Sequence, residues 1–415
     1  MALTLLLIAL APLAAAIVIL VQMVSSRPRL PPDAPREVRG WPLLGCLDFF
    51  RRRRDFLVWG SKLGPGRQFS FFYGPHPIVA VSGPEARASF FNSRELSLGA
   101  GFAGLYAASP NIEHLPEGNV AGNFMSLAKR LLHRDRLEAV LPTMVSDADT
   151  ALATSDAILE PFALMLRLVY KLTHRTLGSN DIADNQDLLE ETLAVFGKLD
   201  QSSALEIMFP RLFTPSKLRK MMAGLKLHRV FSAVVERRRV EGRKQMDAMQ
   251  LLMEATNSNA QISAFIISAL FAGLINSTFN AAWILVYLST NPDWYARIRS
   301  EVDASIARHG LPDETPPKTL TRLSLSDWES DFPLVEVAMR ETIRLIGRGV
   351  CMRKNFAKLE IIITTVTTFA HYDFHRCDKH GDDVSLPLPG LVRSSIGEKR
   401  PEHDVFLRCV SRGGC

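Results

Sequence analysis

Hydrophobic residues follow two different periods along the chain, and the change between them divides it into an early part with strands and a longer helical part. Residues 68–73 and 78–82 are rich in aromatic and β-branched side chains, and Gly74-Pro-His-Pro77 between them is typical of a hairpin turn. From about Leu127 onward, apolar residues recur at three- and four-residue intervals, over 137–152, 158–177 and 188–199. The pattern predicts a mainly α-helical fold with a small β-sheet near the N-terminus.

A long apolar stretch, residues 261–290, is the most informative of the predicted helices. Its length and composition would allow it to cross a membrane. Asn276, Ser277 and Asn280 lie in its middle, however, and polar groups at such positions favour a helix that crosses the protein core beside a buried ligand. Asn291-Pro292 then ends this helix and begins another, because proline is well tolerated in a first helical turn.

Two other helical segments are predicted from composition and from their first residues. Pro84 opens a helix after the hairpin, with acidic Glu85 beside the positive end of the helix dipole. Residues 216–249 form a basic amphipathic helix or a pair of them. A solvated face explains their charge better than binding to a partner does.

The N-terminus predicts a transmembrane anchor over residues 1–25. Between Ala2 and Val24 there is no charged residue, and about 20 apolar residues suffice to cross the hydrocarbon core. A cleaved signal peptide is the alternative, although its usual positive n-region is missing. Arginines follow this segment, at 27, 29, 36, 39 and 51–54, so the positive-inside rule places the body of the protein in the cytosol. A proline-rich linker, 26–45, then leads to a body over 46–415.

Composition narrows the class of protein further. The chain has 415 residues, of which 47% are hydrophobic and 22% are charged, so a packed globule of one large or two ordinary domains is expected. The net charge of +6 is modest and lies in local clusters without a nucleic-acid-binding motif. A lipid bilayer or an acidic partner fits this charge better than nucleic acid does.

The five cysteines are scattered and lack paired spacing, which argues against a disulfide framework and a zinc ribbon and favours a reducing compartment. His371, His375, Cys377 and His380 resemble a metal cluster in composition. They lie in a polar tail and also lack paired spacing, so zinc is the less favoured interpretation.

In this order the features resemble the cytochrome P-450 family of membrane-bound, haem-thiolate monooxygenases. The resemblance covers nearly the whole chain, from the anchor, the linker with Gly40-Trp-Pro-Leu-Leu-Gly45 and the hairpin to the long apolar helix, Asn291-Pro-Asp-Trp294 and Arg340-Glu-Thr-Ile-Arg344. It implies a mainly α fold with a small sheet, and haem iron as the cofactor. It also implies a lipophilic small-molecule substrate (a terpenoid, sterol, fatty acid or other secondary metabolite), a membrane reductase as electron donor, and a single-pass location in the endoplasmic reticulum membrane with the catalytic domain facing the cytosol.

The resemblance also implies roles for charged residues around the haem. Glu341 and Arg344 would form a buried charge network that braces the core under the haem, where loss of one partner would strand a buried charge. Lys129 and Arg130 lie in about the region where the family contacts a haem propionate, although a basic helix face explains them equally well.

The long apolar helix resembles the family's oxygen-binding helix through Ala272-Gly273, and Gly273 would make room for a diatomic ligand. The family's acid position holds Ile275 and its alcohol position holds Asn276, followed by Ser277. Since isoleucine cannot relay protons, two alternatives are open. Ser277 with ordered water would take over proton delivery, or the chain would act as an isomerase-type member on a substrate that is already oxygenated.

The segment Phe356-Ala-Lys-Leu-Glu360 resembles the family helix that follows the haem-ligating cysteine, but only residues 345–355 separate it from the Glu-x-x-Arg motif. This short spacing indicates an internal deletion near 355/356 with loss of the cysteine loop. Cys351 stands five residues before Phe356, which is the family spacing, although Arg353 replaces the family's glycine. The favoured interpretation of Cys351 is a structural, reduced cysteine. Cys351 as the metal ligand is the alternative.

Three hypotheses follow from the sequence. The first is a haem-dependent monooxygenase, and the second is a catalytically inactive or mis-spliced remnant without haem. The third is a two-span membrane protein, in which residues 261–290 would face lipid.

Overall fold

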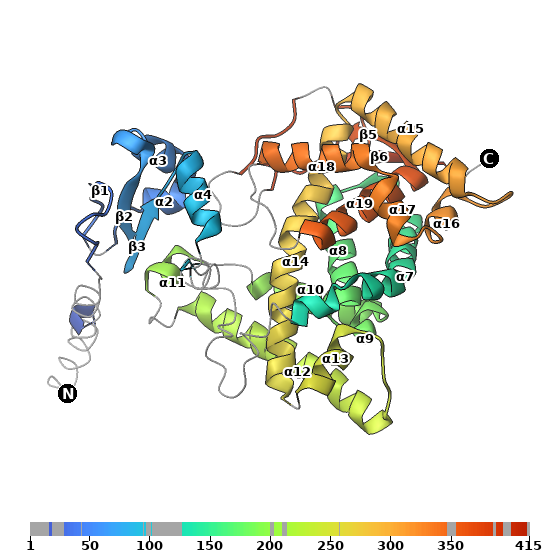
Figure 1. Ribbon diagram of the computed structural model, residues 1–415, viewed down its shortest axis with the longest axis horizontal. Helices are drawn as coiled ribbons and strands as arrows, with labels where there is room; N and C mark the ends of the chain where they lie inside the picture. Colours follow the sequence, from blue (N-terminus) through green and yellow to red (C-terminus); the bar gives the residue numbers. More distant parts are fainter. Residues whose placement is uncertain are drawn as a thin grey trace, which may run out of the picture. The chain divides into compact units, whose positions relative to one another are not determined.

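The computed structural model describes residues 16–18, 29–42, 44–93, 95–96, 101, 127–199, 203–209, 214–256, 258–346, 354–384, 387–392 and 400–412. The chain forms two compact units (Figure 1). Unit 1 comprises residues 1–109, 199–222 and 393–396, and unit 2 comprises residues 110–198, 223–392 and 397–415. Apart from residues 16–18, the predicted anchor lies outside the described residues.

Unit 1 contains a three-stranded sheet in the order β1-β2-β3. Its elements are β1 (Glu37–Val38), α2 (Asp48–Arg51), α3 (Arg53–Gly60), a short 3-10 turn (Pro65–Arg67), β2 (Phe69–Tyr73), β3 (His76–Ala80), α4 (Pro84–Asn92) and α11 (Ala204–Met208). Strands β2 and β3 pair antiparallel from Phe69 opposite Ala80 to Tyr73 opposite His76, which confirms the predicted hairpin. Gly74 turns this hairpin with φ of +56°, and an added Cβ there would lie 2.7 Å from the Cα of Met208.

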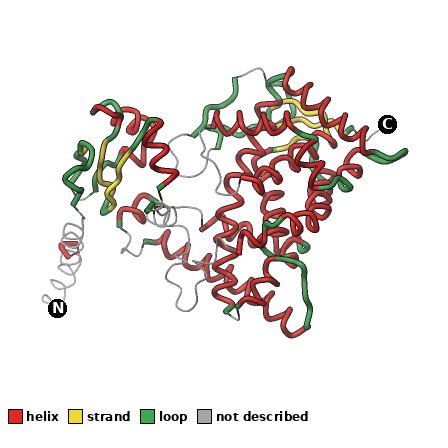
Figure 2. Tube along the Cα trace, viewed as in Figure 1, coloured by secondary structure: helices red, strands yellow, loops and turns green. Residues whose placement is uncertain are grey.

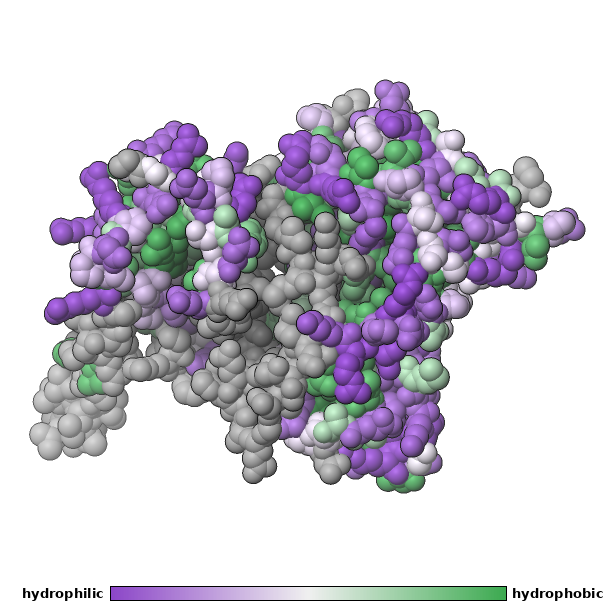
Figure 3. Space-filling model, in the orientation of Figure 1, coloured by the Kyte–Doolittle hydropathy of each residue, from purple (hydrophilic) through white to green (hydrophobic). Residues whose placement is uncertain are grey.

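Unit 2 is mainly helical, as Figure 2 shows, and carries a second small sheet in the order β4-β6-β5. Its first helices are α7 (Arg134–Ala153), α8 (Pro161–Leu177), α9 (Asn180–Ala183), α10 (Gln186–Leu199), α12 (Pro215–Glu241), α13 (Ala248–Ala255) and α14 (Asn259–Leu288). The last residue of α10 and residues 215–222 of α12 belong to unit 1. The later ones are α15 (Pro292–His309), α16 (Pro316–Leu320), α17 (Leu325–Ser330), α18 (Pro333–Ile346) and α19 (Lys354–His371). The strands are β4 (Ile158–Leu159), β5 (Tyr372–Cys377) and β6 (Phe406–Ser411). On the face of unit 2 in Figure 3, hydrophilic residues predominate.

The predicted helix starts are confirmed where a proline or a capping residue marked them. Pro84 and Pro292 occupy the first turns of α4 and α15. The side chain of Asn291 accepts a hydrogen bond of 3.2 Å from the backbone N–H of Trp294, so it satisfies one donor that the helix leaves unpaired. The basic stretch after residue 215 forms a pair of helices, α12 and α13.

Helix α14 is the core helix of unit 2 and packs against α8 and α19. Among the described residues it is the one helix long and apolar enough to cross a membrane, but 78% of its most apolar window is buried inside the protein. Lipid is therefore not needed to cover it. This burial supports the predicted core helix and argues against the two-span hypothesis, because a helix that faces lipid would leave its apolar side chains uncovered by protein.

A buried ion-pair cluster ties α9, α12 and the start of α13 together. The guanidinium of Arg238 is fully buried and donates at 2.8 Å to Oδ2 of Asp181 and at 2.8 Å to Oδ1 of Asp247. Burial by itself would raise the pKa of Asp181, but hydrogen bonds from Arg243 and Arg238 bring it below its ordinary value. Asp181 thus favours its ionised form in the interior because two guanidinium groups balance its charge.

Candidate functional site

Helix α14 is buried over most of its length. Between Gln261 and Leu288, Ala272 is the one exposed residue, and Ile275, Asn276 and Tyr287 are half-buried. Residues four apart lie on one side of a helix, so Ala272 and Asn276 share this accessible face. We refer to Ala272, Ile275 and Asn276 as the open face of α14.

Gly273 faces α8 inside the core, while its predicted role of making room for a diatomic ligand stays a prediction. It is buried, and a Cβ added to it would lie 3.2 Å from Cγ2 of Thr173 in α8 and 3.9 Å from the ring of Phe356 in α19. The missing side chain therefore permits the close approach of α8.

Ser277 also points into the core, one turn beyond Gly273. Its hydroxyl donates a 2.7 Å hydrogen bond to Oε2 of Glu360, and Glu360 reaches it from α19. Oε1 of Glu360 lies 3.0 Å from Oγ1 of Thr173. Ser277 and Glu360 are both completely buried, so α8, α14 and α19 meet at one polar node formed by Thr173, Ser277 and Glu360.

The number of donor hydrogens at the node indicates whether Glu360 is protonated. Oγ1 of Thr173 lies 2.8 Å from the carbonyl oxygen of Val169 and 3.0 Å from Glu360, but a hydroxyl has one hydrogen to donate. If Glu360 is protonated, its O–H donates to Thr173, Thr173 donates to Val169, and Ser277 donates to the other carboxyl oxygen. All three bonds are then made.

The electrostatics of the node agree with this count. Burial raises the pKa of Glu360 from 4.5 to about 8, while the hydrogen bonds to Ser277 and Thr173 oppose that shift. A neutral carboxylic acid is therefore the form present in the core at neutral pH. Sequence reasoning missed Glu360 as a functional residue, although a single carboxylate within Leu359-Glu-Ile-Ile-Ile363 was a signal that it needed partners.

Glu341 and Arg344 are paired but exposed, and this corrects the expectation of a buried charge network. The guanidinium of Arg344 donates to the Glu341 carboxylate at 2.7 Å and 2.5 Å, while the side chains remain 69% and 50% exposed for Arg344 and Glu341 respectively. The buried side of α18 is formed by other residues, Val335, Met339, Thr342 and Ile346. Glu341 and Arg344 lie off this stripe because the helix repeats every 3.6 residues.

The cysteines that the structure describes do not fit the role of a haem ligand, which requires a thiolate. Cys46 in unit 1 and Cys377 and Cys409 in the second sheet are all buried and free. Burial raises the pKa of Cys46 to about 11 and that of Cys409 to about 12, and it also raises the pKa of Cys377. These thiols keep their protons. Cys351, the sequence-predicted candidate, lies outside the described residues.

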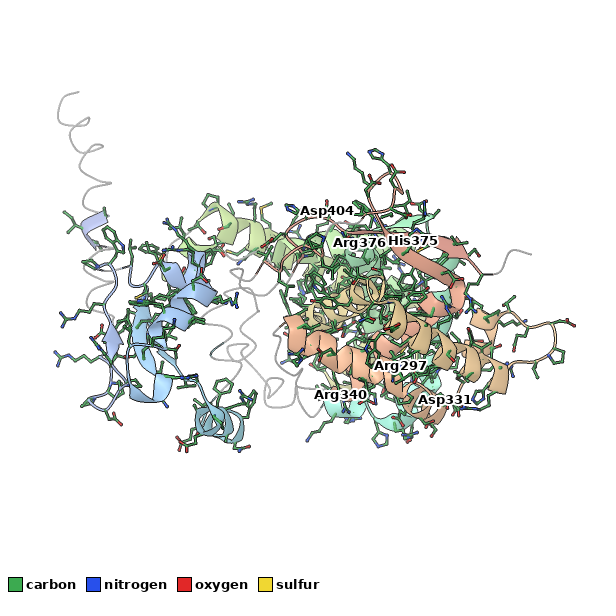
Figure 4. The ribbon with its side chains drawn as sticks, turned by 90° about the horizontal axis from the view of Figure 1, so that it is seen from above. Arg297, Asp331, Arg340, His375, Arg376 and Asp404 are labelled. Carbon is green, nitrogen blue, oxygen red and sulfur yellow. The ribbon has the colours of Figure 1, made fainter. Side chains whose placement is uncertain are left out.

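The remaining sequence candidates are placed as follows. Lys129 and Arg130 are both exposed, just before α7. His371 and His375 do not converge on a common site, since His371 contacts Asp149 at 2.8 Å and His375 contacts Asp383 at 3.1 Å. Among the described residues no group of three potential ligands could hold a metal ion. Figure 4 shows His375 and Arg376 on one side of unit 2, opposite Arg297, Arg340 and Asp331.

Comparison with known proteins identifies the fold and then the family. The retinoic-acid-bound cyanobacterial CYP120A1 matches with a TM-score of 0.68 at 15% identity, over 92% of this chain and 100% of that one, so the fold is that of a cytochrome P-450. The cytochrome P-450 family model matches residues 124–347, which is more than half of the chain. The protein therefore belongs to the cytochrome P-450 family, a class of oxidoreductases that act as monooxygenases.

Two fungal relatives are monooxygenases of the same family. Cytochrome P-450 monooxygenase AacuE of Aspergillus aculeatus is 28% identical over 80% of this chain and 70% of its own length. Cytochrome P-450 monooxygenase claM of Passalora fulva is 28% identical over 80% of this chain and 66% of its own length. The chain thus spans about two thirds of the length of these relatives.

Proposed function

We propose that the protein is a haem-dependent monooxygenase that oxidises a lipophilic small molecule, such as a terpenoid, a sterol, a fatty acid or another secondary metabolite. The observation that carries this proposal is the open face of α14. In a family member whose core helix is mostly buried between Gln261 and Leu288, the helix is exposed at Ala272 and half-buried at Asn276, the positions that resemble the oxygen-binding turn. Haem bound beside this face would supply the oxygen-activating chemistry.

In this proposal Cys351 is the remaining candidate for the thiolate ligand, the alternative to the structural role that its sequence context favours. The three buried cysteines hold their protons, and of the two others Cys351 stands at the family spacing before α19. A membrane reductase would supply electrons. The predicted anchor over 1–25 would hold the protein in the endoplasmic reticulum membrane as a single-pass protein, with the catalytic domain facing the cytosol.

The open face itself offers hydrogen bonds but no proton donor of suitable acidity. Asn276 donates and accepts through a neutral amide, and Ile275 is apolar. The hydroxyl of Ser277 is already donated to Glu360 inside the core, so it is not free to deliver protons to the open face. This observation favours a second candidate function, an isomerase-type reaction on a substrate that already carries oxygen.

A third possibility is a remnant without haem, produced by the internal deletion predicted near 355/356. Two observations favour a missing segment, since the family match ends at residue 347 and Glu341 and Arg344 are left exposed. A longer transcript that restores a cysteine loop before Phe356 would support this alternative.

Isotope-labelled oxygen separates the three candidates in one assay. The full chain is expressed in membranes with a reductase and NADPH and is given a terpenoid, a sterol, a fatty acid and a fatty-acid hydroperoxide. Label in a product from the first three supports the monooxygenase. Conversion of the hydroperoxide without label and without NADPH supports the isomerase. If the folded chain retains no haem and forms no product, the proposed function is wrong.

A further inference from the structure

Burying the carboxyl group of Glu360 in the centre of a helical core costs free energy. It is completely buried, and burial is the dominant influence on its carboxyl group. A buried carboxyl group contributes less to folding stability than an apolar side chain of the same volume. Its hydrogen bonds therefore point to a role that hydrophobic packing does not fill. Its two partners lie on two other helices, which suggests that its role is to fix geometry between them.

The hydrogen bond to Ser277 is well placed to set the rotation of α14. Ser277 follows Asn276 directly, and it lies on the same side of the helix as Gly273. Gly273 provides no side chain to interlock with α8, and its neighbour Thr173 is itself held by Glu360. On this side of the helix, the Ser277 hydroxyl is the group that donates to α19.

Elsewhere along α14, Ser263 makes another directional contact, since its hydroxyl lies 2.9 Å from Nδ1 of His228 in α12. The helix is apolar around most of its circumference, so hydrophobicity alone does not distinguish its faces, although close packing against its neighbours opposes rotation. Hydrogen bonds, unlike hydrophobic contacts, depend on direction and fail when donor and acceptor turn away from each other. The directional contact at Ser277, next to the open face, therefore adds to the specificity that close packing and the Ser263 contact provide.

We propose that Glu360 is a positioning residue of the oxygen-facing helix: through its hydrogen bond to Ser277 it holds α14 at the rotation that keeps Ala272 and Asn276 on the open face. This inference rests on the proposed function for its meaning in catalysis. The geometric part of it concerns the protein without haem and is tested there.

Thiol labelling at position 272 reports this rotation. The full chain carrying Ala272→Cys is treated with a maleimide, and labelling at that site is followed by peptide mass spectrometry so that native cysteines do not interfere. Because residue 272 is exposed in the folded protein, its labelling does not require unfolding. Rotation of α14 in either direction carries it toward buried neighbours and slows the reaction.

Three variants in this background separate positioning from general packing. Glu360→Gln keeps the network, because its amide oxygen accepts from Ser277 and its N–H donates to Thr173, so labelling stays as in the parent. Glu360→Leu removes the bond to Ser277, and labelling falls by about fivefold if this bond contributes about 1 kcal/mol to the preferred rotation. Ser277→Ala gives a similar fall, and the double variant Glu360→Leu/Ser277→Ala falls no further.

Thr367→Val is the matched control. Thr367 is buried on the same helix α19, and its hydroxyl has no hydrogen-bond partner among the described residues, so its removal leaves labelling unchanged. Circular dichroism confirms folding of each variant, and Ser277→Ala carries the test where Glu360→Leu fails to fold. Unchanged labelling in folded Ser277→Ala, or an equal fall in Thr367→Val, overturns the positioning role.

A second readout distinguishes this inference from the proposed function. Haem added to the Ala272→Cys protein protects the thiol if the open face borders the haem. Loss of protection by Glu360→Leu with rescue by Glu360→Gln supports positioning toward the haem. If haem gives no protection while the differences between variants persist, the proposed function fails and the geometric role of Glu360 stands.

Discussion

Replacing Glu360 by glutamine isolates the energetic cost of an ionisable group in the core. Burial raises the pKa of Glu360 from 4.5 to about 8, so between these pH values the folded chain holds one proton more than the unfolded chain. The free energy of unfolding then falls by about 1.4 kcal/mol for each pH unit of increase. Stability from the protonated group is fully present below about pH 4.5 and is lost as the pH rises through about 8.

The magnitude follows from the interval between the unfolded pKa and the working pH. At neutral pH, ionisation of the unfolded state costs the native protein on the order of 3 kcal/mol relative to acidic pH. Glutamine does not ionise and keeps the hydrogen bonds to Ser277 and Thr173. The unfolding free energy of Glu360→Gln minus that of the parent should therefore increase by about 1.4 kcal/mol per pH unit between about pH 5 and about pH 7.5.

Urea unfolding followed by far-ultraviolet circular dichroism measures this difference at several pH values. Other ionisable groups titrate equally in the two proteins and cancel in the subtraction. A difference that stays constant with pH would show that Glu360 is ionised in the folded protein, and the hydrogen-bond count at the node would be wrong.

Further predictions concern the close approach of α8, the buried charge cluster and the α18 pair. Gly273→Ala should lower the free energy of unfolding by about 1–3 kcal/mol because Thr173 is held in place and cannot move aside, whereas the control Gly197→Ala, with no atom near its added Cβ, should raise it by about 0.5–1 kcal/mol. Arg238→Met should cost about 3–5 kcal/mol in urea unfolding, since two buried carboxylates lose their balancing charge; an unchanged midpoint would contradict the burial of this cluster. Glu341→Gln should leave the melting temperature nearly unchanged, because the pair is exposed; a large drop would restore the buried network.

The sequence predicted elements well where local signals were strong. The hairpin of β2 and β3, the first turns of α4 and α15, and the core position of α14 all followed from glycine, proline and polar residues at definite places. The rotation of α14 could not be predicted, because a helix that is apolar on almost every side has no periodicity that identifies its faces. For the same reason, the contact of Gly273 with α8 could not be predicted.

The exposure of Glu341 and Arg344 on α18 was not predicted, for a different reason. The stripe formed by Val335, Met339, Thr342 and Ile346 is readable in the sequence, and its spacing alone places Glu341 and Arg344 on the other side of the helix. The prediction of a buried charge network followed the family resemblance and not this local pattern. Glu360 could not be assigned from sequence, because its partners Thr173 and Ser277 lie on helices far away in the chain and meet it only in the folded protein.

The haem-thiolate assignment is tested most directly by the reduced, carbon-monoxide difference spectrum of the full chain with added haem, recorded beside that of Cys351→Ser. We predict the red-shifted Soret band of thiolate ligation in the parent and its loss in Cys351→Ser, with circular dichroism unchanged between the two. A folded parent without that band, or a band that persists in Cys351→Ser, would contradict the account.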